Sequence, residues 1–437
     1  MEINYVPLLM FVSLIIGLFI GIPIAFVLGF ISIIFAYFLW GVGGMSLLIN
    51  AAWGTMNNFP LLAIPLFIFM ALMLQKSEVV SDLYDTFYKW SGGLRGGLAA
   101  ATIGVGAVLG AVSGVIAAGV VGLGLVALPQ MLKYKYDKNI SMGSVMAGGT
   151  LGQLIPPSVN MIVYGVVTGV SVGGLFAGGL WCGVILALLY IAYILIKSFI
   201  NKKLCPSLPP GKRATWREKI VSLKEIIGPS LLILTVLGAI FSGATTPTEA
   251  AAVGALGAIV FSLIMRRFTW LRFKESAIDT LKITSMVGWI IIGASAFGSV
   301  FSGVGGNQLV TQIAMSLPGG RWGVLALSII FVLFLGMFLE TTAMIMLAAP
   351  IISPLLIKFG FDPLWWGLVF NVLLQVAFIS PPFGFALFYL RGVTPKGINI
   401  EDIYMSVLPF IVLQLIFILL MLLFPNYVVW LPRLLFK

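Results

Sequence analysis

The chain has 437 residues, of which 60% are hydrophobic and 9% are charged. A soluble protein of this length carries about a quarter charged residues, so the composition excludes a water-soluble globule. The sequence has no His and two Cys, Cys182 and Cys205, which excludes His-based catalytic triads and zinc sites built from His or clustered Cys. The net charge of +11 would suggest nucleic acid for a soluble protein, but here it indicates basic loops on an anionic cytoplasmic leaflet. We therefore predict an all-α polytopic membrane protein with no nucleic-acid partner.

Apolar runs of about 20 residues predict the membrane spans, because an α-helix of that length crosses the hydrocarbon core. Residues 1–75 contain no Lys or Arg, whereas a signal peptide would need a basic region there, so we expect the first run to be a retained span. The predicted full spans lie near residues 6–21, 23–40, 59–75, 141–165, 173–196, 226–242, 247–265, 283–303, 363–388 and 404–424.

Two longer runs can form either two tight spans each or a re-entrant hairpin that enters and leaves on one side. Residues 96–132 carry no charge, and residues 322–357 carry only Glu340. Hairpin tips at mid-membrane depth should be small and polar, which fits Ser113-Gly114 and Glu340-Thr341-Thr342. We therefore predict about ten full spans and two re-entrant hairpins.

The positive-inside rule orients the chain. With an outside amino terminus and two hairpins, 21 of the 25 Lys and Arg residues fall in cytoplasmic loops, and the four outside are Arg321, Lys358, Arg433 and Lys437. Two spans in place of each hairpin would return the chain to the same side, so the bias gives the orientation without establishing the hairpins. We expect a multi-pass protein of the bacterial inner membrane with both termini in the periplasm.

Landmarks of the first half of the chain recur in the second half, in the same order and 221–226 residues later. The pairs are Pro23 and Pro247, Gly29 and Gly254, Arg95 and Arg321, Pro129 and Pro350, and Pro156-Pro157 and Pro381-Pro382. Five spans and one hairpin give each half an odd number of crossings, so the second half has the opposite orientation, as in the inverted repeats of secondary transporters. A chance alignment of two Pro- and Gly-rich membrane sequences is the alternative.

The repeat divides the chain into two halves and a linker. The parts are the first repeat at 1–196 (hairpin about 92–130, broken helix about 141–165), the linker at 197–225, and the second repeat at 226–437 (hairpin about 321–357, broken helix about 363–388). We expect the basic, Pro-rich linker to be cytoplasmic and to include an interfacial helix. Residues 268–282 are a second interfacial candidate, and an ordinary solvated loop is the alternative for both.

Two segments inside apolar runs are predicted to break their helices. Residues 148–158 read Gly-Gly-Thr-Leu-Gly-Gln-Leu-Ile-Pro-Pro-Ser, and residues 377–384 read Ala-Phe-Ile-Ser-Pro-Pro-Phe-Gly. Consecutive prolines remove backbone donors, and carbonyls freed in lipid must meet protein, water or a cation. Broken helices at mid-membrane can bind Na⁺ through carbonyls and present helix N-termini to an anion. A simple kink is the alternative, but paired breaks at equivalent positions favour a binding site.

A hairpin tip that faces a broken helix would form a cation site from hydroxyl and carbonyl oxygens. Proton coupling should instead place carboxylates or His in the membrane, and the spans hold only Glu340 and Glu249, so we expect Na⁺ as the coupling ion and no other cofactor. Glu340 is either a substrate ligand or gate or a capping residue, whereas Glu249 fits a capping box with Thr246. The predicted sodium-binding positions are Ser113, Gly114, Gly149, Thr150, Gly152, Thr341, Thr342 and Ser380. The predicted substrate-binding positions are Gln153, Pro157, Ser158, Glu340, Pro381 and Gly384.

Several other residues indicate structure rather than chemistry. Small-residue patterns such as Gly104-x-Gly106 favour close helix packing, and Asn57-Asn58 favours a turn or a helix entry. Trp and Tyr are enriched at the membrane interface, and the predicted anchors there are Trp365, Trp366, Tyr427 and Trp430.

The motifs resemble those of the large membrane subunit of tripartite ATP-independent periplasmic (TRAP) transporters, the DctM family, over essentially the whole chain. The most specific match is residues 149–158 followed by Met-Ile-Val-Tyr-Gly at 161–165, and further blocks lie at 59–67, 244–254 and 380–384. The resemblance implies an elevator-type, Na⁺-driven importer of small organic anions within the ion-transporter superfamily. The implied partners are the organic acid substrate, a small four-helix membrane subunit (Q-type), a periplasmic substrate-binding protein (P-type) and membrane lipid.

Gln153 and residues 383–392 look more like the branch associated with 2-oxo acids and related carboxylates than the sialic-acid branch. Family members often carry Ser or Thr through the first hairpin, but residues 115–124 here have none, so a sodium ion there would rely on backbone carbonyls and Ser113. We therefore expect the transport subunit of a Na⁺-coupled importer of small carboxylates, such as 2-oxo acids or C4-dicarboxylates, delivered by a periplasmic binding protein.

Three alternatives to this function remain open. One is a self-sufficient ion-coupled carboxylate antiporter, and another is a passive channel. A membrane-embedded enzyme is disfavoured because the predicted spans hold no His, no pair of acids and no cluster of metal ligands.

Overall fold

The computed structural model describes residues 5–113, 116–382, 384–395 and 397–436, without the side chains of Val80, residues 111–113 and Ala118. The described residues form α-helices, three short 3₁₀ helices and turns, with no strand among them, which confirms the all-α prediction. Eight helical segments are long and apolar enough to cross a membrane, and six shorter apolar helices accompany them. The predicted polytopic class is confirmed.

The helices of the first half are α1 Val6–Phe19, α2 Ile24–Met56, η1 Phe59–Leu62, α3 Ala63–Lys76, α4 Val79–Ser91, α5 Gly97–Ser113, α6 Ile116–Lys133, α7 Lys138–Thr150, η2 Leu151–Gln153, α8 Val159–Thr168 and α9 Val172–Ile200. The linker and second half contain η3 Pro210–Lys212, α10 Trp216–Ser222, α11 Lys224–Phe241, α12 Pro247–Ile264, α13 Trp270–Gly303, α14 Gly306–Ser316, α15 Gly320–Gly336, α16 Thr341–Lys358, α17 Pro363–Ile379, α18 Phe385–Arg391, α19 Ile400–Leu423, α20 Pro425–Val428 and α21 Trp430–Leu435.

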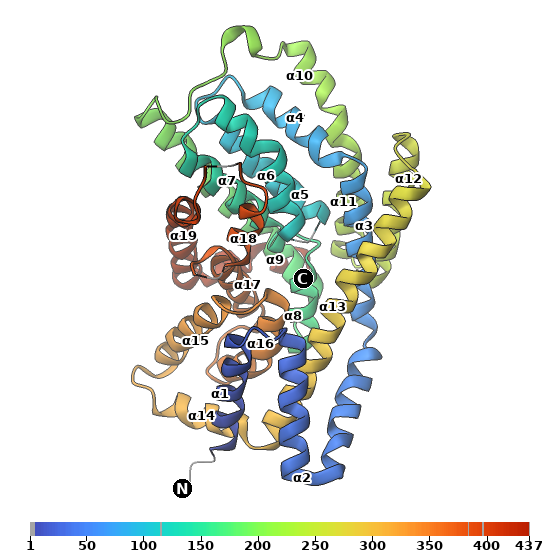
Figure 1. Cartoon of the computed structure of the whole chain (residues 1–437), viewed down its shortest axis with the longest axis vertical. Helices are drawn as coiled ribbons and strands as arrows, with labels where there is room; N and C mark the ends of the chain where they lie inside the picture. The colour runs from blue at the N-terminus through green and yellow to red at the C-terminus, as the bar shows by residue number, and fades with distance from the viewer. Residues whose placement is uncertain (1–4, 114–115, 383, 396, 437) are drawn as a thin grey trace.

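Helices α1–α3 and α11–α13 pack together, and we call them the scaffold group. The helix α2 lies along α13, and α3 lies along α12, so the two halves contact each other throughout this group (Figure 1). The helix α13 is continuous over 34 residues. Most of the interfacial candidate at 268–282 and the span at 283–303 therefore form one continuous helix, with neither Gly nor Pro at the junction between them. The alternative of a solvated loop is wrong for residues 270–282.

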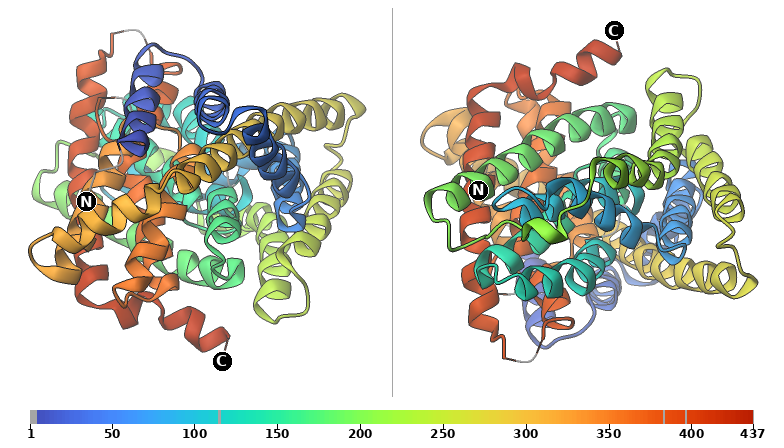
Figure 2. Two further views of the ribbon diagram at one scale, coloured as in Figure 1. Left: turned by 90° about the horizontal axis from the view of Figure 1, so that it is seen from below. Right: turned by 90° about the horizontal axis from the view of Figure 1, so that it is seen from above.

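The helix pairs α5–α6 and α15–α16, the broken helices α7–α8 and α17–α18, and the long helices α9 and α19 form a second group, the core group. Figure 2 shows this group beside the scaffold helices α11–α13. Within it the two halves exchange partners, since α8 packs against α16 and α18 packs against α6. Each half-helix that follows a break is thus held by a helix pair of the other half.

Two residues with positive φ interrupt the helices of the scaffold group, 225 positions apart. Gly41 interrupts α2 with a φ of 60°, and Arg266, 225 positions later, has a φ of 56° between α12 and α13. Glycine adopts this left-handed conformation without strain, so the predicted span at 23–40 ends where the kink occurs. A second helical stretch follows this interruption and ends at Met56, and the sequence did not predict it.

Side-chain caps explain where several helices begin. Thr246 accepts a hydrogen bond from the backbone nitrogen of Glu249 at 3.3 Å, and the Glu249 carboxylate accepts one from the backbone nitrogen of Thr246 at 2.8 Å. This confirms the capping box at α12, which satisfies donors that the first helical turn leaves unpaired. Asp137 caps α7 in the same way, by accepting from the backbone nitrogen of Ile140 at 3.0 Å.

The linker is fastened to the helices that surround it. The backbone nitrogen of Leu208 donates to the carbonyl oxygen of Gly92 at 2.9 Å, and that of Gly96 donates to the carbonyl oxygen of Cys205 at 3.1 Å. Farther along, Oγ1 of Thr86 in α4 donates to the carbonyl oxygen of Ser222 at the end of α10 at 3.0 Å. Residues 204–208, which we call the strap, are therefore bonded to the base of α5 rather than solvated as a free loop.

Two of the predicted interface aromatics lie in the core instead. Trp366 is 0% exposed, Trp365 is 3% exposed, and Nε1 of Trp365 donates to the carbonyl oxygen of Met421 at 3.0 Å. Tyr427 and Trp430, in contrast, are exposed around the ring of Trp181. The prediction is wrong for Trp365 and Trp366, because α17 is surrounded by other helices of the core group.

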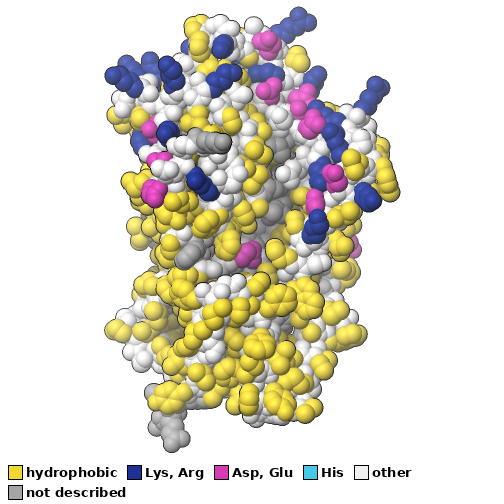
Figure 3. All heavy atoms as spheres, viewed as in Figure 1, with side chains coloured by type: hydrophobic (Ala, Val, Ile, Leu, Met, Phe, Trp, Pro, Cys, Tyr) yellow, Lys and Arg dark blue, Asp and Glu magenta, His cyan; other side chains and the backbone are white. Residues whose placement is uncertain are grey.

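The charged side chains gather at one end of the molecule. Figure 3 shows Lys, Arg, Asp and Glu over the end at which α4, α10 and the corner between α12 and α13 lie, while hydrophobic side chains cover most of the rest of that face. A protein that spans a membrane would present this charged end to water.

Candidate functional site

Both paired-proline segments interrupt their helices. The helix α7 and the turn η2 precede the turn that holds Pro157, and α8 follows it; α17 precedes the turn that holds Pro381, and α18 follows it. The peptide bonds Pro156-Pro157 and Pro381-Pro382 are cis. Since proline supplies no backbone donor, the helical hydrogen bonding stops at equivalent places in the two halves, which we call the first and second breaks.

Glycines bring the first helix pair against the first break. A Cβ atom at Gly110 would lie 2.4 Å from the Cα atom of Gly152, and a Cβ atom at Gly119 would lie 2.7 Å from the carbonyl oxygen of Gly149. Close backbone approach of this kind requires residues without side chains. The predicted positions Gly149 and Gly152 therefore lie where α5 and α6 meet the break.

The second break brings two carbonyl oxygens close to Gly384. A Cβ atom at Gly384 would lie 2.8 Å from the carbonyl oxygen of Phe378 and 2.8 Å from that of Ser380. The Ser380 oxygen also accepts a hydrogen bond from the backbone nitrogen of Gly384 at 3.0 Å, and Tyr404 donates to the carbonyl oxygen of Pro382 at 3.0 Å. The backbone nitrogen of Ser380 would also lie 2.9 Å from that Cβ atom, so the backbone is tightly packed around Gly384, and its carbonyl oxygens are the atoms there that could bind a cation.

Glu340 caps α16. One carboxylate oxygen accepts from the backbone nitrogens of Thr342 at 2.9 Å and Ala343 at 3.3 Å, and the other accepts from the hydroxyls of Thr341 at 3.0 Å and Thr342 at 3.2 Å. Nδ2 of Asn160 in α8 donates to Oγ1 of Thr341 at 3.2 Å. Of the two roles that the sequence allows for Glu340, the structure contains the capping role. The hydrogen bond from Asn160 to Thr341 joins the start of α16 to α8, the half-helix that follows the first break.

The predicted hydroxyl ligands at the breaks are turned towards backbone carbonyls of their own segments. Oγ1 of Thr150 donates to Met146 at 2.9 Å, Oγ of Ser158 to Gln153 at 2.6 Å and Oγ of Ser380 to Val376 at 2.7 Å. A hydroxyl that donates in this way keeps its lone pairs for a cation. Gly114 and the side chain of Ser113 lie outside the described residues, so the first hairpin tip is not placed.

Sequence reasoning missed the amide residues that contact two predicted positions. Gln153 is fully buried and donates from Nε2 to the backbone oxygen of Asn371 at 3.4 Å, while Gln375 donates from Nε2 to Oγ1 of Thr150 at 3.4 Å. Asn371 and Gln375 are polar residues one turn apart in an otherwise apolar helix of 17 residues. That spacing is the signal that could have identified them.

A cavity of about 550 Å³ lies between the scaffold and core groups. Ser295, Ser299 and Ser302 line it from one face of α13, opposite Met346 and Pro350 of α16. The remaining polar lining residues are Asn50, Thr55, Asn58 and Asn307. The three serines are four and three residues apart in an apolar helix, and this spacing predicts a polar helix face. We did not predict this face from the sequence.

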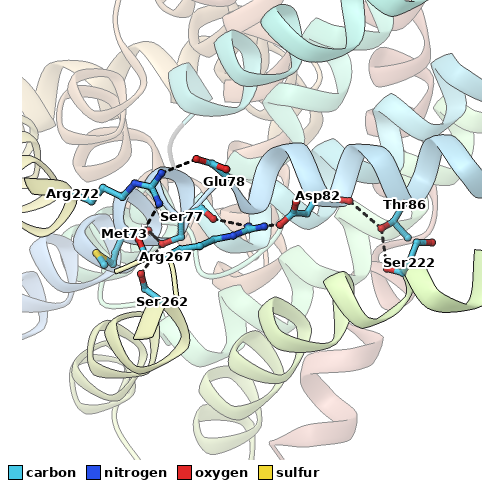
Figure 4. Close-up of polar contacts among 9 residues, drawn as sticks. All are labelled: Met73, Ser77, Glu78, Asp82, Thr86, Ser222, Ser262, Arg267 and Arg272. Atoms are coloured by element: carbon cyan, nitrogen blue, oxygen red, sulfur yellow. Dashed lines mark hydrogen bonds and ion pairs between the residues drawn. The ribbon is translucent and has the colours of Figure 1, made fainter. Parts of the chain in front are cut away.

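The corner between α3 and α4 is bonded to the corner between α12 and α13 (Figure 4). Nη1 of Arg267 donates to the carbonyl oxygen of Ser77 at 2.9 Å and pairs with Asp82, and Nη2 of Arg272 pairs with Oε1 of Glu78 at 2.7 Å. The hydrogen bond to Asp82 raises the pKa of Arg267 above its ordinary value. These contacts fix the place where α4 leaves the scaffold group for the first helix pair.

Comparison with known proteins places the chain among transport proteins. The sequence model of the family described as "Tripartite ATP-independent periplasmic transporter, DctM component" matches residues 11–427. The C4-dicarboxylate TRAP transporter large permease protein DctM of Pseudomonas aeruginosa is 32% identical over 382 residues, covering 87% of this chain and 87% of the relative. The sialic acid TRAP transporter large permease protein SiaM of Vibrio cholerae is 30% identical, covering 95% of this chain and 96% of the relative.

Among solved structures, the YdaH transporter of Alcanivorax borkumensis shares the fold, with a TM-score of 0.67 and 14% identity over 96% of this chain and 98% of that chain. The matched family consists of transporter permease subunits, which confirms the prediction that the chain is not an enzyme. The chain is a multi-pass membrane protein, and it belongs to the DctM family of TRAP transporter large permease subunits.

Proposed function

We propose that the chain is the transport subunit of a Na⁺-coupled importer of small organic acids in the bacterial inner membrane. The names of the two permeases reported above refer to C4-dicarboxylates and to sialic acid. Both of these substrates are acids. For this chain we propose a small carboxylate, such as a 2-oxo acid or a C4-dicarboxylate, with Na⁺ as the coupling ion and no other cofactor.

The observation that carries the sodium proposal is the pair of carbonyl oxygens of Phe378 and Ser380 next to Gly384. Each would lie 2.8 Å from a Cβ atom at Gly384, so the two oxygens lie near each other at the second break, and broken helices at mid-membrane bind Na⁺ through carbonyl oxygens. The hydroxyls of Thr341, Thr342 and Ser380 are proposed further ligands. An equivalent site at the first break would use Gly149, Thr150 and Gly152 with Ser113 and Gly114.

An inverted repeat accounts for the paired breaks. The series from α11 to α19 follows the order of the series from α1 to α9, with the positive-φ residues Gly41 and Arg266 and the paired prolines about 225 positions apart. We propose that 1–196 and 226–437 are repeats of opposite orientation joined by 197–225. In an elevator mechanism the core group would carry substrate and ions past the scaffold group.

The substrate would bind between the breaks and the second helix tip. Ser158, Pro157, Pro381 and Gly384 lie in the two turns, where half-helix N-termini favour an anion. Asn160 adds an amide donor beside this region. Gln153 is buried against α17 and Glu340 caps α16, so these two predicted substrate positions would act by shaping the site.

The partners follow from the family. Its name describes a tripartite, ATP-independent periplasmic transporter of which DctM is one component, and we propose as the other two a periplasmic substrate-binding protein and a small four-helix membrane subunit. The charged end in Figure 3 supports a cytoplasmic position for α4, α10 and the linker, because Lys and Arg favour the cytoplasmic side. Both termini would then be periplasmic.

The proposal can be tested by uptake into proteoliposomes that contain the chain, its small subunit and its binding protein. We expect uptake of a carboxylate that the binding protein recognises to require a Na⁺ gradient and to stop when choline or K⁺ replaces Na⁺. Unchanged uptake in choline would exclude sodium coupling, and full uptake without the binding protein and small subunit would indicate the self-sufficient antiporter instead.

A matched pair of glycine variants tests the site itself. A Cβ atom in Gly384→Ala would clash with the two carbonyl oxygens and displace them, so half-maximal uptake should need more Na⁺. Gly392→Ala, whose nearest contact would be 3.5 Å, should behave as wild type. Equal Na⁺ dependence of the two variants would contradict a sodium site beside Gly384.

A further inference from the structure

Three buried amide side chains lie where the first break meets α17. Gln153 in η2 and Asn371 and Gln375 in α17 are each 0% exposed. The amide oxygens of all three have no hydrogen-bond partner among the described residues. An unpaired buried oxygen is unfavourable, because it has lost its bonds to water without replacement. Three such oxygens in one place indicate that a further species binds there.

The orientation of each amide is set by the acceptor that its nitrogen meets. Nδ2 of Asn371 donates to the carbonyl oxygen of Gly367 at 2.8 Å, and Nε2 of Gln153 donates to the carbonyl oxygen of Asn371 at 3.4 Å. Nε2 of Gln375 donates at 3.4 Å to the hydroxyl of Thr150, which uses its own proton on a helix carbonyl. Rotating Asn371 or Gln153 by half a turn would place oxygen against a carbonyl, and rotating Gln375 would place its oxygen against a hydroxyl whose proton is already used on the helix. The assigned orientations therefore leave the three oxygens free.

The hydrogen bonds of these residues connect the first break to α17 at two points. Thr150 and Gln153 are separated by one turn of chain, as are Asn371 and Gln375. One hydrogen bond runs from Gln153 to Asn371 and the other from Gln375 to Thr150, so each pair of residues contacts the other pair. Residues one turn apart lie about 5–6 Å apart, so the three amides belong to one cluster rather than to separate parts of the core.

The chemistry of the cluster favours a cation. A single water molecule donates two hydrogen bonds and would leave one of the three oxygens unpaired, whereas a cation can be bound by all of them. The described residues contain no group of three acidic, Cys or His side chains, so the cluster offers neutral oxygens, which suit a single positive charge. We propose that the amide oxygens of Gln153, Asn371 and Gln375 bind a small monovalent cation.

This amide site is separate from the sodium site proposed beside Gly384. It is enclosed between η2 and α17, and its ligands are side chains instead of carbonyls of the second break. Its function would be to hold the first break against α17 while the core group moves. The amide site does not depend on Na⁺ being the coupling ion. A bound cation can stabilise the protein even if the gradient of a different ion drives transport.

The test is the Na⁺ dependence of thermal unfolding of the full chain in detergent at pH 8, with choline chloride keeping the ionic strength constant. Gly384→Ala serves as the parent, so that the proposed coupling site contributes little. In this parent, Gln375→Glu replaces an amide oxygen by a charged one and should lower the Na⁺ concentration at half-saturation by about tenfold, because charged ligands bind more strongly. Gln375→Leu should abolish the Na⁺-dependent rise in Tm.

Gln414→Glu in α19 is the matched control, because Gln414 is equally buried but lies outside η2 and α17. It should lower Tm without changing the response to Na⁺. The proposal is overturned if Gln375→Leu retains the full Na⁺ response, which decides the matter even if Gln375→Glu fails to fold. It is also overturned if folded Gln375→Glu has the half-saturation of the parent, the result expected for water. Failure here would leave the uptake experiment with Gly384→Ala unaffected, so the two proposals are distinguishable.

Discussion

Gln375 donates a hydrogen bond to the hydroxyl of Thr150, and the two residues are 225 positions apart. The same separation relates Pro156 to Pro381 and Pro157 to Pro382. In a structure built from two repeats related by a twofold axis, a residue can contact its own counterpart only close to that axis. The contact between Thr150 and Gln375 is therefore compatible with the proposed inverted repeat, whose axis would pass close to these two residues.

The approach of α5 to α7 should be intolerant of a methyl group. A Cβ atom at Gly106 would lie 2.4 Å from backbone atoms of Gly148, which cannot move aside as a side chain can. Gly106→Ala should therefore lower the free energy of unfolding by about 1–3 kcal/mol, measured by denaturation in detergent. Gly288→Ala in α13 is the control, since nothing lies within 4 Å of its added Cβ and alanine favours helix. Equal stability of the two variants would contradict the close approach.

The cap on α16 gives a prediction for Glu340. Glu340→Ala removes acceptors for two backbone nitrogens and two hydroxyls, and loss of an N-cap costs about 0.5–2 kcal/mol. Glu340→Gln keeps one acceptor oxygen, so it should retain most of the stability and measurable uptake. Thermal unfolding and uptake should be measured on the same preparations. A Gln variant with normal Tm but no uptake would show that the charge acts on substrate or ion and that capping is not its main role.

The corner contacts in Figure 4 should be coupled energetically. Arg267 and Asp82 are each about one-quarter exposed, at 26% and 24%, so their interaction should be about 1 kcal/mol or less. A double-mutant cycle with Arg267→Ala and Asp82→Ala would measure it by thermal unfolding. The exposed Lys274 is the control partner, and Lys274→Ala combined with Asp82→Ala should be additive. Additivity of the Arg267 and Asp82 variants would contradict the ion pair.

The strap makes Cys205 a reporter of linker attachment. Burial raises the pKa of the Cys205 thiol to about 11, so the reactive thiolate at pH 7.5 should be about 100-fold scarcer than in an ordinary cysteine. In a Cys182→Ala background, maleimide labelling of Cys205 should be slow and should accelerate as the pH rises towards 11.

Gly96→Ala should speed that labelling at constant pH. Gly96 has a φ of 75°, and an added Cβ would lie 2.5 Å from Oγ of Ser198, which would disturb the hydrogen bond from Gly96 to Cys205. Gly211→Ala, with nothing within 4 Å, should label as slowly as the parent. Rapid labelling of the parent would show that the strap is not bonded in solution.

Local chemistry made much of this fold predictable. Paired prolines cannot continue a helix, and the helices stop before Pro156 and before Pro381. Thr246 and Glu249 have the capping spacing and form the capping box. Both features depend on residues close together in the chain, which is where sequence reasoning is strongest.

Packing over long separations was not predictable from one sequence. Trp366 resembles an interface anchor, but helices distant in sequence bury it. The strap is held by backbone hydrogen bonds to Gly92 and Gly96, which lie more than 100 residues earlier in the chain. Asn371 and Gln375 contact the first break from the other half of the chain. Their hydrogen-bond partners are therefore more than 200 residues away and form no local motif with them.

The strap has a consequence for how the two halves came to be one chain. Residues 204–208 belong by their hydrogen bonds to the first half, and α10 is bonded to α4 by its far end. Between them lies Gly211, an exposed residue in a short turn whose Cβ would meet nothing. A cut at this turn would leave the strap with the first half and α10 still bonded to α4 across the cut, so two polypeptides ending and beginning there could reassemble as an ancestral pair of separate subunits would have done.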